Sequence, residues 1–275
     1  MNRDRGALSD RQLGALALAA AGLPVFRCCC AVSWPWVLLG GAAAALTLSA
    51  LSRASGRLRD AIVFPAAGLL ALGALAAAWE SSFSFPETAG KPLAAALVLG
   101  LGTAAAQRGA EAAGRCAGIL LRLTGALYGI VLIFSLPQLR PDRLRPAGTP
   151  ADALRVWASL LPSGAALCLR RESGGGKALR WPWWASAAAA LSASLVTGGI
   201  LSPALASEPE SFRTLARGVS VLGVIRRFEA LVNGAMLMSG FCLCALLLTA
   251  AGSLIQGKNA GKRPKKFFEK MQKKC

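Results

Sequence analysis

Apolar residues occupy most of this chain in long blocks, which are separated by short segments rich in Pro, Gly and charged side chains. Most blocks are close to the roughly 20 residues that an α-helix needs to cross the hydrocarbon core of a bilayer. Because a lipid-exposed backbone must satisfy its own hydrogen bonds, each block is predicted to be a helix. The pattern therefore predicts an all-α polytopic membrane protein with about eight transmembrane helices, at about 12–32, 34–52, 61–79, 90–106, 114–136, 152–169, 181–203 and 228–255.

Basic residues gather at every second boundary between these blocks. They lie before the first block, between the second and third, the fourth and fifth, the sixth and seventh, and after the eighth. Eight spans would place all of these groups on one side, which the positive-inside rule assigns to the cytoplasm. The basic loop at 137–151 is the exception. We predict a transmembrane domain over 1–256, a basic tail over 257–275, and both termini in the cytoplasm of a bacterial cell.

Composition agrees with a membrane protein. The chain is 55% hydrophobic and 16% charged, whereas soluble domains carry about 25% charged residues. Its net charge of +18 would suit nucleic acid, but the basic residues lie in short loops and a tail. We therefore expect membrane lipid, and no nucleic acid, as a partner of these residues.

Catalytic and metal-binding patterns are missing from the sequence. It has no histidine, which removes a common zinc ligand, and no CxxC pair among its eight cysteines. No nucleophile–base pair, phosphate-binding loop or pair of intramembrane carboxylates stands out. We expect no enzyme activity, cofactor or metal, and we expect the cysteines inside apolar blocks to pack as small hydrophobic residues.

Two apolar blocks contain residues that interrupt helices. The first block contains Gly22 and Pro24, and the sixth contains Pro162, Ser163 and Gly164. Proline removes a backbone donor and glycine tolerates unusual dihedral angles, so each group predicts either a simple kink or a broken helix. Transporters hold substrates at pairs of broken helices, and a break in the first and sixth helices is typical of inverted five-helix repeats. These five residues are our candidate ligand-binding residues.

A third candidate lies at the start of the last block. Glu229 stands just inside the apolar segment, two residues after Arg227 in the run Arg226-Arg227-Phe228-Glu229. An acidic residue at this depth could carry a proton or contact a ligand, or it could form an ion pair with Arg226 or another nearby arginine. Arg227 and Glu229 are therefore candidates for an ion pair or a gate. The mixed segment at 204–222 is expected to form a short helix at the outer surface.

Short motifs spread along the chain together resemble one protein family. The motifs are Leu8-Ser9-Asp10-Arg11-Gln12-Leu13, Phe85-Pro86-Glu87-Thr88, the segment from Arg108 to Arg115, Pro162-Ser163-Gly164, and the segment from Gly218-Val219-Ser220 through Arg227-Phe228-Glu229. Their order is similar to that in the spore-germination permeases, the B subunits of nutrient germinant receptors in endospore-forming bacteria, which belong to the amino acid–polyamine–organocation superfamily.

The resemblance implies a fold like that of the leucine transporter, with the first and sixth helices broken around a site at mid-membrane. It implies an amino acid or similar small nutrient as ligand, and a larger membrane subunit and a lipoprotein subunit as partners in the spore inner membrane. The family usually has ten helices, so eight would make this a truncated bundle. An ion-coupled amino-acid transporter and a structural membrane protein without a ligand are the alternatives.

Overall fold

The computed structural model describes residues 9–52, 63–82, 90–144, 146, 148–169, 177–208, 211–218 and 228–261. These residues are almost entirely helical, and none of them forms a strand. Four helices in this part of the chain are long and apolar enough to cross a membrane, namely Asp10–Cys29, Trp34–Leu51, Ala110–Gln138 and Glu229–Ile255. The prediction of an all-α membrane protein is therefore confirmed, while the count of eight crossing helices stays a prediction.

A helix lies at the position of every predicted span, although two of the spans are not regular α-helices. The first consists of α1 (Asp10–Pro24) and a π-helical turn η1 (Val25–Cys29), and the sixth of α7 (Pro150–Leu160), a 3-10 turn η5 (Leu161–Ala165) and α8 (Ala166–Leu169). The others are α2 (Trp34–Leu51), α4 (Val63–Ser81), α5 (Gly90–Gln107), α6 (Ala110–Ser135), α9 (Lys177–Ile200) and α12 (Phe228–Gly261).

Shorter elements connect the long helices. The loop after α6 contains two 3-10 turns, η3 (Leu136–Gln138) and η4 (Pro141–Arg143). The short helices α10 (Pro203–Ala206) and α11 (Ser211–Gly218) precede α12, where the sequence predicted one surface helix. Helix α12 continues past residue 256, where we expected the basic tail to begin, and residues 262–275 lie outside the described part of the chain.

Local signals in the sequence fix where several helices begin. Ser9 Oγ accepts a hydrogen bond from the Gln12 N–H (3.3 Å), and Gln12 Oε1 accepts one from the Ser9 N–H (3.0 Å). This capping box satisfies two of the free donors at the start of α1. Thr149 and Asp152 cap α7 in the same way. Gly109, with φ of 95°, makes the left-handed turn between α5 and α6 that other residues rarely adopt.

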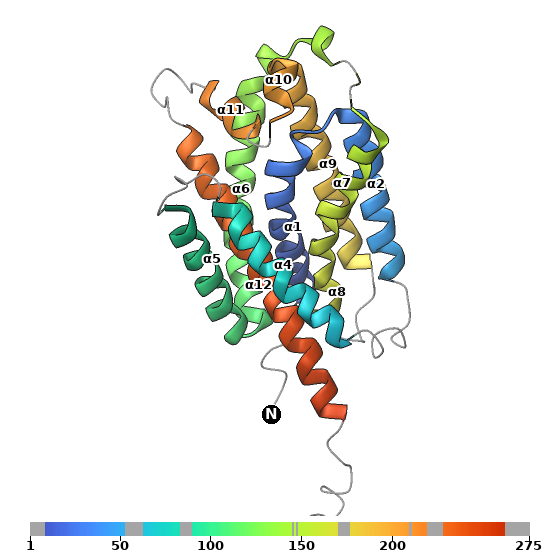
Figure 1. The fold of residues 1–275 in the computed structure, drawn as a ribbon, viewed down its shortest axis with the longest axis vertical. Coiled ribbons are helices and arrows are strands. Elements are labelled where there is room, and N and C mark those ends of the chain that lie inside the picture. The colour runs from blue at the N-terminus through green and yellow to red at the C-terminus, as the bar shows by residue number, and fades with distance from the viewer. Residues whose placement is uncertain are drawn as a thin grey trace, which may run out of the picture.

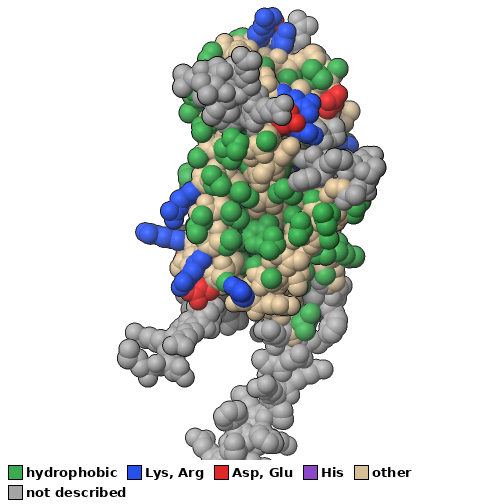
Figure 2. All heavy atoms as spheres, turned by 90° about the vertical axis from the view of Figure 1, so that its left-hand side faces the viewer, with side chains coloured by type: hydrophobic (Ala, Val, Ile, Leu, Met, Phe, Trp, Pro, Cys, Tyr) green, Lys and Arg blue, Asp and Glu red, His purple; other side chains and the backbone are tan. Residues whose placement is uncertain are grey.

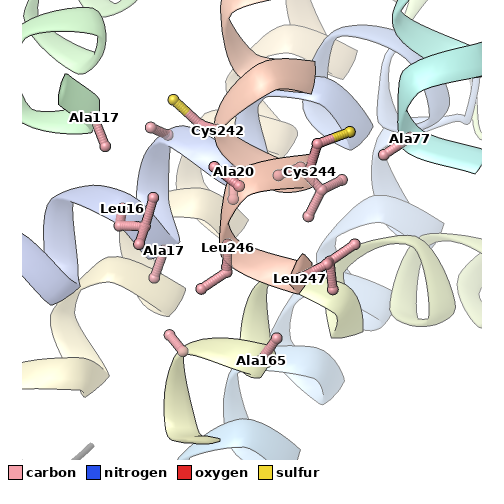
Figure 3. Packing of buried hydrophobic residues seen from close by; sticks show 14 of the residues in the cluster. Leu16, Ala17, Ala20, Ala77, Ala117, Ala165, Cys242, Cys244, Leu246 and Leu247 are labelled. Carbon is pink, nitrogen blue, oxygen red and sulfur yellow. The ribbon is translucent and has the colours of Figure 1, made fainter. Parts of the chain in front are cut away.

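Small side chains let the central helices approach closely. Ala17 and Ala20 of α1 and Cys244 of α12 are fully buried in one core cluster, shown in Figure 3. Cys244 Sγ donates a hydrogen bond to the Ala74 carbonyl of α4 (3.1 Å). In a membrane, where lipid is as apolar as the side chains, such close packing is a main source of helix association. The expectation that cysteines inside apolar blocks pack as small hydrophobic residues agrees with the burial of Cys242 and Cys244, whereas Cys116 and Cys168 are only partly buried.

The helix ends separate into two groups (Figure 1). The start of α1, the end of α2, the turn between α5 and α6, and the end of α12 lie at one end of the bundle. Turn η4 and helices α10 and α11 lie at the opposite end. This alternation agrees with the prediction that the basic boundaries share one side, while the assignment of that side to the cytoplasm stays a prediction.

Candidate small-molecule site

The first interruption is a change of hydrogen-bond pattern inside a continuous helix. Gly22 and Pro24 remain helical, and the π-turn follows at Val25–Cys29. Because Pro24 has no N–H, the Ala20 carbonyl lacks the donor that an α-helix would place four residues later. The next donor, the Val25 N–H, makes the usual α-helical bond to the Ala21 carbonyl and shares it with the Gly22 carbonyl. Single π-turns inside α-helices occur frequently at functional sites.

The second interruption is tighter than an α-helix. Pro162, Ser163 and Gly164 lie in the 3-10 turn η5, and Ser163 Oγ donates a hydrogen bond to the Leu160 carbonyl (2.7 Å). A side chain on Gly164 would collide with Leu48 of α2. In the structure Ser163 therefore makes a local hydrogen bond and Gly164 packs closely against Leu48, while a role of these residues in ligand binding stays a prediction.

A cavity of about 160 Å³ lies beside the first interruption. Its walls come from α1 with η1, α6, α9 and α12. Gly22 is the one predicted ligand-binding residue in the lining; Pro24 is the neighbour of the lining residue Val25 in the chain, and the residues of η5 are not part of the wall. Turn η5 contacts α1, but the two interruptions do not share this cavity.

Four hydroxyl groups lie in the wall of the cavity, which is otherwise apolar. They belong to Thr124, Tyr128, Ser186 and Ser239. Thr124 Oγ1 donates to the Leu120 carbonyl (2.9 Å), Ser186 Oγ to the Trp183 carbonyl (2.8 Å), and Tyr128 Oη to the Ala189 carbonyl (2.6 Å). A hydroxyl has one hydrogen and two lone pairs, so three of these groups have used their donor and keep acceptor capacity.

Aromatic rings line the same cavity. Phe26 of the π-turn and Tyr128 of α6 are both part of the wall, and their ring centroids are 5.8 Å apart. The buried Phe212 of α11 completes the cluster, at 5.1 Å from Phe26 and 5.7 Å from Tyr128. The sequence analysis missed all three residues. The signal that could have found Phe212 is the amphipathic pattern at 211–218, where apolar positions alternate with arginines at helical spacing.

Charged pairs lie around the site but do not line it. Arg27 Nε of the π-turn is 2.7 Å from Glu80 Oε2 at the end of α4, and its guanidinium also donates to the Glu80 carbonyl (2.6 Å). The sequence analysis did not predict this pair, because 53 positions separate the two residues.

The candidate Glu229 binds two arginines of α11. Its carboxylate is 3.0 Å from Arg213 and 2.5 Å from Arg217. The interpretation of Glu229 as an ion-pair residue therefore agrees with the structure, with these arginines as its partners. Arg227 lies outside the described residues. These two ion pairs hold α11, which carries Phe212, against the start of α12.

Comparisons with known proteins identify no relative: no protein-family model matches the chain, and no curated protein matches it.

Proposed function

We propose that this chain is a permease-like membrane protein that binds a small molecule with an ammonium group, such as an amino acid, in the cavity between α1, α6, α9 and α12. The observation that carries the proposal is the composition of the cavity wall beside the π-turn. Four hydroxyl groups and two aromatic rings line an otherwise apolar space next to a helix whose backbone pattern changes.

The chemistry of the wall favours a cationic donor. An ammonium group has three donors and no acceptor, which complements hydroxyls whose hydrogens already bond to backbone carbonyls. The rings of Phe26 and Tyr128 also line the wall, and an aromatic face can attract a cation. No acidic side chain is part of the wall among the described residues, so a neutral zwitterion suits the site better than a divalent cation.

The volume limits the size of the ligand. Pockets for drug-sized ligands measure about 300–1,000 Å³, whereas this cavity measures about 160 Å³. It suits a molecule with only a few heavy atoms. Among amino acids, glycine, alanine and serine are the best candidates.

We further propose that the chain acts as the permease-like subunit of a spore nutrient germinant receptor, with eight spans and cytoplasmic termini. The order of the short motifs along the chain supports this, as does the grouping of basic residues at alternate boundaries. The proposed partners are a larger membrane subunit and a lipoprotein subunit. Sensing is favoured over ion-coupled transport, because the described part of the cavity wall provides no carboxylate to carry a proton.

Thermal unfolding of the purified protein in detergent tests ligand binding. L-alanine and methylammonium are expected to raise the unfolding midpoint, whereas acetate is not, since the site recognises the ammonium group. A ligand at a hundred times its Kd adds about 2.7 kcal/mol to stability, which is easily measured.

Matched variants locate the site. Thr124→Val keeps the side-chain shape but removes a hydroxyl from the cavity wall, so it should reduce the shift. Ser163→Ala removes a buried hydroxyl outside the wall and should leave the shift intact. If Ser163→Ala removes the shift and Thr124→Val does not, the ligand binds at η5. Saturable, gradient-dependent uptake of labelled alanine into proteoliposomes would assign transport instead of sensing, and no shift with any amino acid would favour a structural protein.

A further inference from the structure

One surface of α6 places a positive charge where a membrane protein rarely exposes one to lipid. Arg122 lies twelve residues after Ala110 and thirteen before Ser135, at the middle of a helix that is long and apolar enough to span the bilayer. At 1.5 Å per residue, its Cα lies about 18 Å from either end of the helix. The side chain is exposed on the surface of the bundle, and no described acidic residue forms an ion pair with it.

The surface around Arg122 has the shape of a helix-packing face. Gly118, Gly125 and Gly129 follow one side of α6 together with Arg122, and a Cβ at any of the three would meet nothing within 4 Å. Gly125 and Gly129 form a GxxxG pair, whose small residues let a second helix approach closely. The exposed Ile133 (64% exposed) extends this face along the helix. Figure 2 shows one side of the bundle, where hydrophobic side chains dominate and Lys and Arg side chains project at the left edge.

Charge decides what kind of partner fits. An arginine inside the membrane is costly and normally pairs with an acidic group or lines an aqueous path. A second copy of this chain does not fit, because a two-fold contact through this face would bring one Arg122 close to the other. The described carboxylates also lie at helix ends or in loops, where none could reach the mid-membrane face of another copy.

We propose that this face of α6 binds a transmembrane helix of a different protein, which carries an Asp or Glu at the depth of Arg122. The carboxylate neutralises the guanidinium in the low-dielectric interior, and the glycines allow the two backbones to approach. Gly125 also lines the cavity beside the π-turn, so the docked helix would lie next to that cavity. The interface does not depend on which ligand the cavity takes.

A designed peptide tests the proposal in vesicles of zwitterionic phosphatidylcholine. The probe is a fluorescent polyleucine transmembrane helix with one central Glu, and its control carries Gln at that position. Energy transfer to the labelled full-length protein should report at least tenfold tighter association for the Glu peptide. Arg122→Leu should remove this preference, and Gly125→Leu with Gly129→Leu should weaken association of the Glu peptide.

A control with the arginine moved to another helix tests whether binding needs the glycine face as well as the charge. In the control, Arg122→Leu is combined with Leu46→Arg, which places an arginine on the exposed surface of α2, a helix that packs against α7 and α9. This protein should bind the Glu peptide no better than Arg122→Leu does. Unfolding midpoints check that the variants are folded, and a lipid-facing leucine at position 122 should not lower them.

Three outcomes would overturn the proposal. Equal binding of the Glu and Gln peptides would show that charge does not select the partner. If the wild type retains spin-labelled phosphatidylglycerol, Arg122→Leu does not, and neither protein prefers the Glu peptide to the Gln peptide, Arg122 binds a lipid phosphate instead. Cross-linking of two copies through cysteines placed at Ile133 would assign the face to a homodimer.

Discussion

A Cβ on Gly22 of α1 would lie only 2.5 Å from Ser239 Oγ of α12, so the two helices meet here without room for a side chain. Ser239 is 1% exposed and cannot move far, and Phe26 closes the same space at 3.7 Å. The contact lies in the wall of the cavity. It therefore links the packing of the two central helices to the shape of the candidate site.

Gly22→Ala should lower the free energy of unfolding by about 1–2 kcal/mol. Overpacking a well-filled core costs about 1–3 kcal/mol, and the better helix propensity of alanine offsets up to about 1 kcal/mol of this. Ser239→Ala in the same chain removes the clashing Oγ and should restore most of the loss. Unfolding midpoints in detergent measure both effects.

Gly100→Ala is the matched control for this prediction. Gly100 lies within α5, and a Cβ there would meet nothing within 4 Å. The change should be neutral or stabilising by up to about 1 kcal/mol, since alanine is the better helix former. Equal losses from both glycine variants would contradict the assigned contact between α1 and α12.

Glu80→Gln should destabilise the protein by about 1 kcal/mol. Arg27 is 12% exposed and would lose its charged partner, but Glu80 is 44% exposed, so water screens part of the interaction. The Glu80 carbonyl still accepts from Arg27 after the substitution. Glu111→Gln, which breaks the exposed pair with Arg115 four residues away, should cost only about 0.3–0.5 kcal/mol. If Glu80→Gln and Glu111→Gln lose the same amount of stability, the ion pair of Arg27 and Glu80 does not hold α4 against the π-turn.

Hydrophobic blocks were sufficient to predict the helices, because their length and the need to satisfy the backbone in lipid leave few alternatives. Some local signals were also informative about helix geometry. Helix α1 begins directly after the capping residue Ser9, and the Pro and Gly residues of the first and sixth spans lie at or next to the π-helical and 3-10 turns. What local sequence cannot supply is which faces of the helices meet. Ser239 and Tyr128 enter the site through contacts between segments far apart in the chain.

The candidate site shows the same limit. Gly22 was found because glycine before proline perturbs a helix, and it lies at the cavity. Ser163 and Gly164 carry an equally strong local signal, yet they pack into the bundle away from the cavity wall. A signal that disturbs the backbone therefore does not indicate whether the disturbance serves packing or binding.

Glu229→Gln should loosen α11 from the bundle. The carboxylate joins Arg213 and Arg217 of α11 to α12, and glutamine keeps the size but loses the charge. Amide hydrogen exchange in α11 should become faster, while exchange in the core of α12 around Cys244 should stay unchanged. A uniform increase in exchange throughout the chain would instead indicate global destabilisation.

Tyr128→Phe should lower the free energy of unfolding by about 1 kcal/mol, because it removes hydrogen bonds to the Ala189 carbonyl (2.6 Å) and Ser192 Oγ (2.8 Å). The ring remains, so its contacts with Phe26 and Phe212 should persist. The midpoint shift with methylammonium should become smaller but persist, because one hydroxyl acceptor is lost while the aromatic ring remains. Tyr128→Leu should remove that shift, since leucine offers no aromatic face.

Cys30 provides a test of burial through chemical modification. Its side chain is 2% exposed, and Sγ donates to the Val25 carbonyl of the π-turn (3.0 Å). Maleimide should therefore modify Cys30 much faster in the unfolded protein than in the folded one, because the folded bundle keeps the reagent away from the thiol. A Cys30→Ala variant identifies which part of the labelling belongs to this position. Equal labelling rates of Cys30 in the folded and the unfolded protein would contradict a buried thiol next to the π-turn.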